Sequence, residues 1–192
     1  MGSIASKHTS NISVIFDKLG YGGAATLSNT ELINLKPSHL AEVVSWDVAS
    51  TQSFFRFSNP LKITTHNLLS LMNSKESFNR IAWDKANQKI LAFLTLSNHH
   101  VTDGRAQLGF AYNPSLATDT KLLESILSRF CVEGFKFLKL NKIQSFLMTS
   151  DVLMEKLLMR MGALKEGVLT EHFFNDAKFR NVAVYGLFQE NL

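Results

Sequence analysis

The feature that most constrains this fold is a long amphipathic stretch between two strand-like runs. After Asn113-Pro114, apolar residues recur at the period of an α-helix and fall on one face: Leu122, Leu123, Ile126, Leu127, Phe130, Cys131, Phe135 and Leu138. The runs AQLGFAY before it and KIQSFLMTS after it are typical of strands. A helix that joins neighbouring strands of one sheet sets them parallel. The sequence therefore predicts a crossover unit, with its helix between Tyr112 and Lys142.

The elements before this unit predict an antiparallel meander. RIAWD, KILAFLTL and AQLGFAY are strand-like runs, with turn signals at 86–88 and 102–104 between them. Short connections of this kind join antiparallel neighbours. Farther upstream, ELINL predicts a strand and Pro37-Ser38 begins a helix with apolar Leu40, Val43, Val44 and Val48. A second helix, capped near Thr64 or Thr65, carries Leu68, Leu69 and Met72.

After the crossover unit the pattern predicts one more helix and a hairpin. The helix runs from Val152 to Met161 and ends at Gly162, because glycine readily takes the left-handed conformation of a helix cap. The hairpin runs from Leu164 to Phe188 and turns near Asn175-Asp176. Residues 29–192 are thus one α+β domain, and the Ser-, Thr- and Gly-rich residues 1–28 form an N-terminal arm.

Composition narrows the class of protein. A chain of 192 residues with 45% hydrophobic residues supports one folded domain. The net charge of +4 is spread along the chain, which argues against nucleic-acid binding. No apolar run reaches the roughly 20 residues of a membrane span and no secretory signal is visible, so we expect a cytoplasmic protein. The start MGSIAS matches the short N-myristoylation pattern, which also occurs by chance.

The last third carries a family resemblance. The run MGALKEGVLTEHFFNDAKFRNVAVYGL, together with the element order, resembles the GNAT superfamily of acetyl-coenzyme A dependent N-acetyltransferases, and within it the branch that acetylates ribosomal-protein N-termini and amino sugars. The matching positions are Gly162, Glu166-Gly167, Glu171-His172 and Tyr185-Gly186-Leu187. The resemblance implies a mixed, mostly antiparallel sheet with a splayed parallel strand pair and about four helices. It also implies an amine acceptor, either a small molecule or a peptide, and a monomer or homodimer.

The resemblance further implies where acetyl-coenzyme A binds. Its pantetheine arm is expected in the gap between AQLGFAY and KIQSFLM, against backbone groups near Phe110, Ala111 and Tyr112. A backbone N–H there can face the transition-state oxyanion. The pyrophosphate is expected at the N-terminus of the following helix, where unpaired N–H groups favour anions. The residues at that helix start are Ala117, Thr118, Asp119, Thr120 and Lys121, and Asp151 stands at the family's Asn position on the next helix.

Further positions also depart from the family pattern. Ala117 and Asp119 stand where the phosphate loop has glycines, and a carboxylate repels a pyrophosphate. Asp119 has the alternative role of a helix N-cap. Thr118, Thr120 and Lys121 remain as hydroxyl and ammonium donors. Gln107 replaces a frequent Glu, and Leu158 replaces a frequent Tyr acid.

Glu171 and His172 are the candidates for the base that an amine substrate requires. Since neighbouring strand residues point to opposite faces, at most one of them is expected to face the cleft. The alternative is that His172 packs in the hairpin and Glu171 is solvated. The adjacent His99-His100 pair at a hairpin tip lacks the further ligands of a metal site, so no metal is expected.

The acceptor pocket is expected beside Phe54, Phe55, Arg56 and Phe57, whose alternative role is core packing in a helix connection. Three functions remain open at this stage. The first is an N-acetyltransferase that uses acetyl-coenzyme A on a primary amine: an amino sugar, a protein N-terminus or a small amine. The second is a catalytically degenerate GNAT-fold binding or interaction module. The third is a structural subunit whose aromatic surface serves assembly.

Overall fold

The computed structural model describes residues 29–46, 64–175 and 177–192, and every structural statement below concerns these residues. The predicted arm at 1–28 lies outside the described residues. So do Val48 and the predicted acceptor segment with Phe54, Phe55, Arg56 and Phe57.

A single seven-stranded sheet organises the chain, in the order β1-β2-β3-β4-β5-β7-β6. The strands are β1 (Thr30–Ile33), β2 (Phe78–Asp84), β3 (Lys89–His100), β4 (Arg105–Tyr112), β5 (Lys142–Met148), β6 (Leu164–Asn175) and β7 (Lys178–Phe188). β4 and β5 pair in parallel, and the other neighbours pair antiparallel. The predicted meander, crossover unit and final hairpin are confirmed.

The described residues form four α-helices and three 3-10 turns. The helices are α3 (Leu40–Ser45), α5 (Thr65–Asn73), α6 (Thr120–Leu138) and α7 (Val152–Arg160), and the turns are η1 (Pro37–His39), η2 (Pro114–Leu116) and η3 (Gln189–Asn191). Thr64 caps α5 by accepting a hydrogen bond from the Asn67 N–H at 3.2 Å, as the sequence predicted. Gly162 follows α7 with a φ of 81°, which explains the glycine there.

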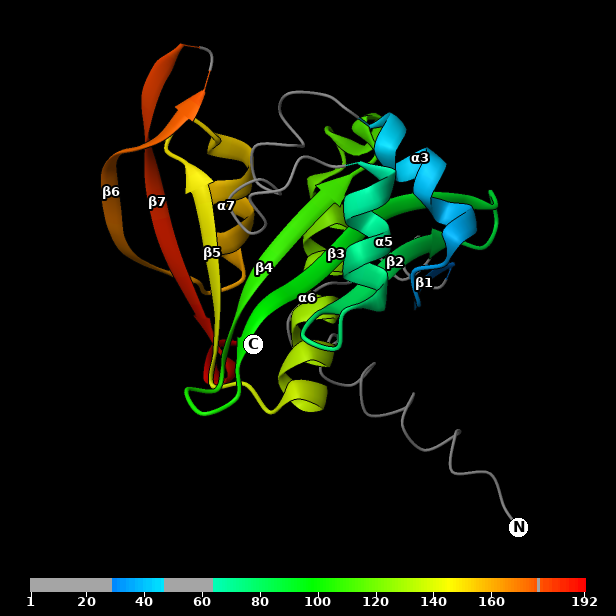
Figure 1. The fold of residues 1–192 in the computed structure, drawn as a ribbon, viewed down its shortest axis with the longest axis horizontal. Helices are drawn as coiled ribbons and strands as arrows, with labels where there is room; N and C mark the ends of the chain where they lie inside the picture. Colours follow the sequence, from blue (N-terminus) through cyan, green and yellow to red (C-terminus); the bar gives the residue numbers. More distant parts are fainter. Residues whose placement is uncertain (1–28, 47–63, 176) are drawn as a thin grey trace.

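Two hydrophobic clusters fill the two sides of the sheet. On one side α3 and α5 pack against β2, β3 and β4, around Val43, Leu68 and Phe93. On the other side α6 and α7 cover the sheet, with Phe130 and Leu157 fully buried. Figure 1 shows α3 and α5 in front of the β1–β4 half and α6 behind it, with α7 beside β5.

The sheet opens between β4 and β5. These strands are in register at only three residue pairs, Arg105 to Gln107 against Lys142 to Gln144. Beyond this point β4 stays paired with β3 as far as Tyr112, and β5 stays paired with β7 as far as Met148. Figure 1 shows the two strands diverging from their shared end near the C-terminus. The sheet is therefore two halves joined by a short parallel contact, as the resemblance implied.

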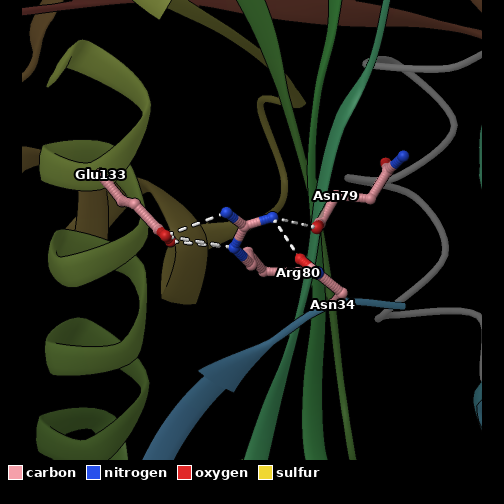
Figure 2. A network of polar contacts seen from close by, with 4 residues as sticks. All are labelled: Asn34, Asn79, Arg80 and Glu133. Atoms are coloured by element: carbon pink, nitrogen blue, oxygen red, sulfur yellow. Dashed lines mark hydrogen bonds and ion pairs between the residues drawn. The ribbon is translucent and has the colours of Figure 1, made fainter. Parts of the chain in front are cut away.

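An arginine on β2 ties the first half to α6. The Arg80 guanidinium donates to both carboxylate oxygens of Glu133 at 3.0–3.2 Å, and to the Asn34 side-chain oxygen at 2.9 Å (Figure 2). It also donates to the Asn79 carbonyl at 3.0 Å and lies 4.1 Å from the centre of the Phe78 ring. Two-point arginine–carboxylate pairing fixes orientation as well as distance, so this contact sets the position of α6 against the sheet.

We expect Glu133→Gln to lower the free energy of unfolding by about 1–2 kcal/mol, because Arg80 would keep its partly buried charge and lose its anionic partner. Urea unfolding followed by circular dichroism measures this. Glu76→Gln is the control, since Glu76 is exposed. A Glu133→Gln protein as stable as the control would contradict the assigned role.

Candidate functional site

Tyr112 and Asp151 lie at the ends of the two diverging strands. Tyr112 is the last residue of β4 and is only 5% exposed. Asp151 follows β5 and caps α7, where its Oδ1 accepts the Met154 N–H at 3.2 Å. Burial raises the pKa of Tyr112, and the charge of Asp151 raises it further. The two side chains are therefore electrostatically coupled across the opening between β4 and β5.

The environment of Asp151 disfavours its charged form. Burial raises the pKa of the Asp151 carboxyl, and the hydrogen bond from the Met154 N–H only partly opposes this. The folded protein thus keeps a carboxylate in a place where ionisation is costly. Groups with such shifts concentrate at functional sites, although ion pairs in the core also produce them.

The second half of β4 borders the same opening. Phe110 packs with α6 on one side of the sheet, and Ala111 packs with the α3–α5 cluster on the other. Pairing between β4 and β5 ends at Gln107 and Gln144, so β4 is no longer paired with β5 beyond that point. Where a strand parts from its neighbour, an extended ligand can pair with backbone groups.

The N-terminus of α6 is capped by Asp119, which confirms the alternative that the sequence offered. Asp119 Oδ1 accepts the Leu122 N–H at 3.0 Å, and its backbone oxygen accepts the Leu123 N–H at 3.1 Å. In the described part of the chain, the N–H groups of Thr120 and Lys121 have no acceptor. This helix end therefore offers two free donors to an anion, beside a fixed negative charge.

Around this helix end, Ala117, Thr118, Asp119 and Lys121 are all exposed, and Thr120 is half-buried. The hydroxyl and ammonium groups that the sequence proposed as donors are accessible from solvent.

Glu171 and His172 lie elsewhere. Both are exposed on β6, and β7 separates that strand from β5. The register between β6 and β7 shifts between Leu169 and Phe173, and Glu171 has a φ of 49°. This bulge breaks the alternation on which the expectation of opposite faces rested. The Glu171 N–H donates to the Asn181 side-chain oxygen at 2.9 Å. The backbone oxygen of Asn181 also accepts the Thr149 N–H at 3.2 Å, near the end of β5. The catalytic role of Glu171 and His172 stays a prediction.

A buried tyrosine holds α7 on the second half of the sheet. Tyr185 on β7 is fully buried, and its hydroxyl donates to the Glu155 carboxylate on α7. Lys165 on β6 approaches the same carboxylate oxygen at 3.4 Å. Burial and Glu155 raise the pKa of Tyr185, whereas the Tyr185 hydrogen bond lowers the pKa of Glu155. This contact fixes α7, and α7 in turn fixes Asp151.

The sequence predicted Tyr112 and Asp151 as two separate contacts to a cofactor. It did not predict that the charge of Asp151 acts on Tyr112. The available signal was their position, since Tyr112 ends β4 and Asp151 comes three residues after the end of β5. Leu158, at the position of the family's frequent Tyr acid, is 1% exposed and its side chain packs in the core.

The described residues contain no group of three or more His, Cys, Asp or Glu side chains placed to hold a metal ion. Cys131 is buried in the core, and burial raises the pKa of its thiol. Among the helices in the described ranges, none is long and apolar enough to cross a lipid bilayer.

Comparisons by sequence and by structure gave different results. No protein-family model and no curated protein sequence matches the chain. Solved structures do match. A spermidine N-acetyltransferase from Vibrio cholerae, in complex with CoA and spermine, has a TM-score of 0.70 at 17% identity and covers 85% of this chain and 98% of its own.

Two further structures of that enzyme agree with this match. The form with manganese ions has a TM-score of 0.72 at 17% identity, covering 86% of this chain and 96% of its own. A point mutant has a TM-score of 0.73 at 16% identity, and the match covers 85% of this chain and 95% of the mutant chain. The chain therefore has the GNAT-like α+β fold, as predicted. The neighbours are named for spermidine, so the ribosomal-protein and amino-sugar branch is not confirmed and stays a prediction.

The cost of the Asp151 charge gives a stability test. Folding raises the pKa of the Asp151 carboxyl above its ordinary value of 3.8. The free energy of unfolding therefore increases as the pH falls through the folded-state pKa toward 3.8, because the folded protein binds the proton more readily than the unfolded chain. Asparagine caps a helix as well as aspartate does and carries no charge. We expect Asp151→Asn to unfold at pH 7 no more easily than the wild type, and to lose this pH dependence.

Asp151→Ala is the matched comparison, because it removes the charge and also the cap. It should lose about 1 kcal/mol relative to Asp151→Asn. Thermal unfolding between pH 4 and pH 8 measures both effects. An Asp151→Asn protein clearly less stable than the wild type at pH 7 would contradict the assigned burial cost.

Proposed function

We propose that the chain is an N-acetyltransferase that moves an acetyl group from acetyl-coenzyme A to a primary amine. The observation that carries the proposal is the opening between β4 and β5, where the pairing of the two strands ends at Gln107 and Gln144 and Asp151 lies beyond the end of β5. The GNAT-like fold supports the reaction class by analogy, since its matched neighbours are spermidine N-acetyltransferases.

The residues present fit the donor in part. The part of β4 beyond Gln107, which is no longer paired with β5, is proposed to border the pantetheine arm. The N–H groups of Thr120 and Lys121 point out of the α6 N-terminus, where a pyrophosphate is favoured. Lys121 adds an ammonium group, and Thr118 adds a hydroxyl. Asp119 opposes these donors, because its carboxylate shares the same helix end.

Bound acetyl-coenzyme A supplies an acetyl group activated as a thioester. The chain contributes by holding that carbonyl against the β4 edge, where a backbone N–H faces the negative charge that develops on its oxygen. Positioning of this kind accounts for a large share of the rate in transfers between two bound partners. Neither Gln107 nor Leu158 has a side chain that moves a proton here.

The acceptor is proposed to be a small amine. The neighbouring enzymes are named for spermidine, and one holds spermine. A protein N-terminus and an amino sugar remain the alternatives, with Phe54, Phe55, Arg56 and Phe57 proposed to border the acceptor. The oligomeric state is proposed to be a monomer or a homodimer.

A catalytically degenerate binding module is the second candidate, and Asp119 favours it. A carboxylate at the α6 N-terminus weakens the binding of a pyrophosphate, and the usual acid and base side chains are replaced at Gln107 and Leu158. Such a module would bind coenzyme A weakly or not at all and would transfer nothing.

Calorimetric titration with acetyl-coenzyme A separates the candidates. We expect micromolar binding and a rise in thermal stability, because a ligand that binds only the folded state stabilises it by mass action. Transfer to spermidine, glucosamine and a peptide with a free N-terminus is then followed by release of coenzyme A thiol. Binding without transfer would support the module, and an absence of binding at millimolar ligand would overturn the acetyltransferase.

Asp119→Asn tests the electrostatics at the α6 N-terminus. Asparagine keeps the cap and removes the charge, so affinity for coenzyme A should rise by about twofold to fivefold, which one exposed charge at a helix end contributes. Lys121→Gln should weaken binding by a similar factor. Both effects should shrink in high salt. An unchanged affinity in both variants, measured by calorimetry, would place the pyrophosphate away from this helix end.

A further inference from the structure

We propose that the Asp151 carboxylate is the group that takes the proton from the acceptor amine. The inference rests on the proposed acetyl transfer, and it gives Asp151 a catalytic role in place of a contact to the cofactor. It also replaces the family positions that carry no usable base in this chain, since Gln107 has an amide and Leu158 is apolar.

The first argument is placement. Asp151 lies three residues after the last residue of β5, at the end where β4 and β5 have separated, and its N–H donates to the Met148 carbonyl at 2.9 Å. Its Oδ1 is held by the Met154 N–H. Among the described residues, Oδ2 has no hydrogen-bond partner. The carboxylate is thus fixed in orientation by one oxygen and keeps the other for a substrate.

The second argument is chemical environment. Burial raises the pKa of Asp151, which brings its basicity closer to that of the protonated amine and makes it a better acceptor. Tyr112 on β4 is the neighbouring titratable group coupled to it, and its own raised pKa keeps the hydroxyl neutral. A neutral hydroxyl beside Asp151 leaves the carboxylate as the base of the pair.

Other charged groups on the surrounding elements are engaged or remote. On α7, Glu155 is bonded to Tyr185 and Lys165, and Lys156 is exposed. On β5 the charged side chain is Lys142, which lies at the other end of the strand and pairs with Glu166 at 2.7 Å. Asp119 and Lys121 are exposed at the α6 N-terminus.

The proton and electron balance is complete. The ammonium form of the acceptor gives one proton to Asp151, and the freed nitrogen lone pair forms the C–N bond to the acetyl carbon. The C–S bond breaks with its electron pair on sulfur. The second surplus proton on nitrogen ends on that sulfur as the free thiol. Asp151 then returns its proton to water, so each turnover yields an amide, a thiol and one proton.

The principal test is the pH profile of Asp151→Asn. General-base catalysis contributes about 10²–10⁴-fold, so kcat/KM for the amine should fall by about that factor. The limb of the wild-type profile that reports the enzyme base should vanish, leaving only the titration of the amine. The KM for acetyl-coenzyme A should change little, because the proton step concerns the acceptor. Thermal unfolding checks that the variant is folded.

Asp84→Asn is the matched control. Asp84 also accepts backbone N–H groups, from Ala86 at 2.9 Å and Asn87 at 3.1 Å, but it is the last residue of β2, before the turn to β3. Its loss should leave kcat/KM and the pH profile unchanged. A decrease in both variants would indicate a general effect of removing a capping carboxylate, and would overturn the assignment.

A second readout needs no activity. Removal of the Asp151 charge should lower the pKa of Tyr112, because the carboxylate disfavours the phenolate. The resonance of ¹³C-labelled tyrosine, assigned with Tyr112→Phe, should therefore titrate at lower pH in Asp151→Asn and not in Asp84→Asn. An unchanged Tyr112 titration would overturn the placement of the pair.

The outcomes separate this inference from the proposed function. If the wild type acetylates an amine and Asp151→Asn retains kcat/KM within threefold with the same pH profile, the function stands and the role of Asp151 is wrong. If the wild type itself transfers no acetyl group to any amine tested, the proposed function fails and the role of Asp151 fails with it.

Discussion

The short parallel contact between β4 and β5 is the constraint on which the rest of the structure depends. Because α6 joins these strands, they must be parallel neighbours, yet they are in register at only three residue pairs. Each then follows its antiparallel partner, β3 or β7, into its own half of the sheet. The opening is thus set by the backbone, and Tyr112 and Asp151 lie at its ends because both strands end there.

A site built between two halves of a sheet is only as rigid as the contacts within each half. Arg80 and Glu133 fix α6 to the first half, whereas Tyr185 and Glu155 fix α7 to the second. These contacts lie away from the opening, and they position the helices whose N-termini border it. Polar pairs at partly buried positions serve this purpose well, since their geometry is more specific than that of apolar packing.

The sequence predicted the fold much better than the site. Helical period, turn residues and the glycine after α7 gave the element order correctly, because these depend on local backbone and burial preferences. The bulge at Glu171 was not predictable, since it depends on register with β7. The coupling of Tyr112 to Asp151 also escaped, because it joins residues from two strands whose separation no local pattern encodes.

Asp119 and Asp151 are both helix N-caps, but their charges affect the stability of the fold differently. Each caps a helix by accepting the backbone N–H of the residue three positions later, at 3.0 Å and 3.2 Å. Asp119 is exposed, so water screens its charge and the cap is its main contribution to the fold. Asp151 is half-buried and its pKa is raised by burial, so its cap comes with a charge that opposes folding. Since asparagine provides the same cap without that cost, capping alone does not account for an aspartate at position 151.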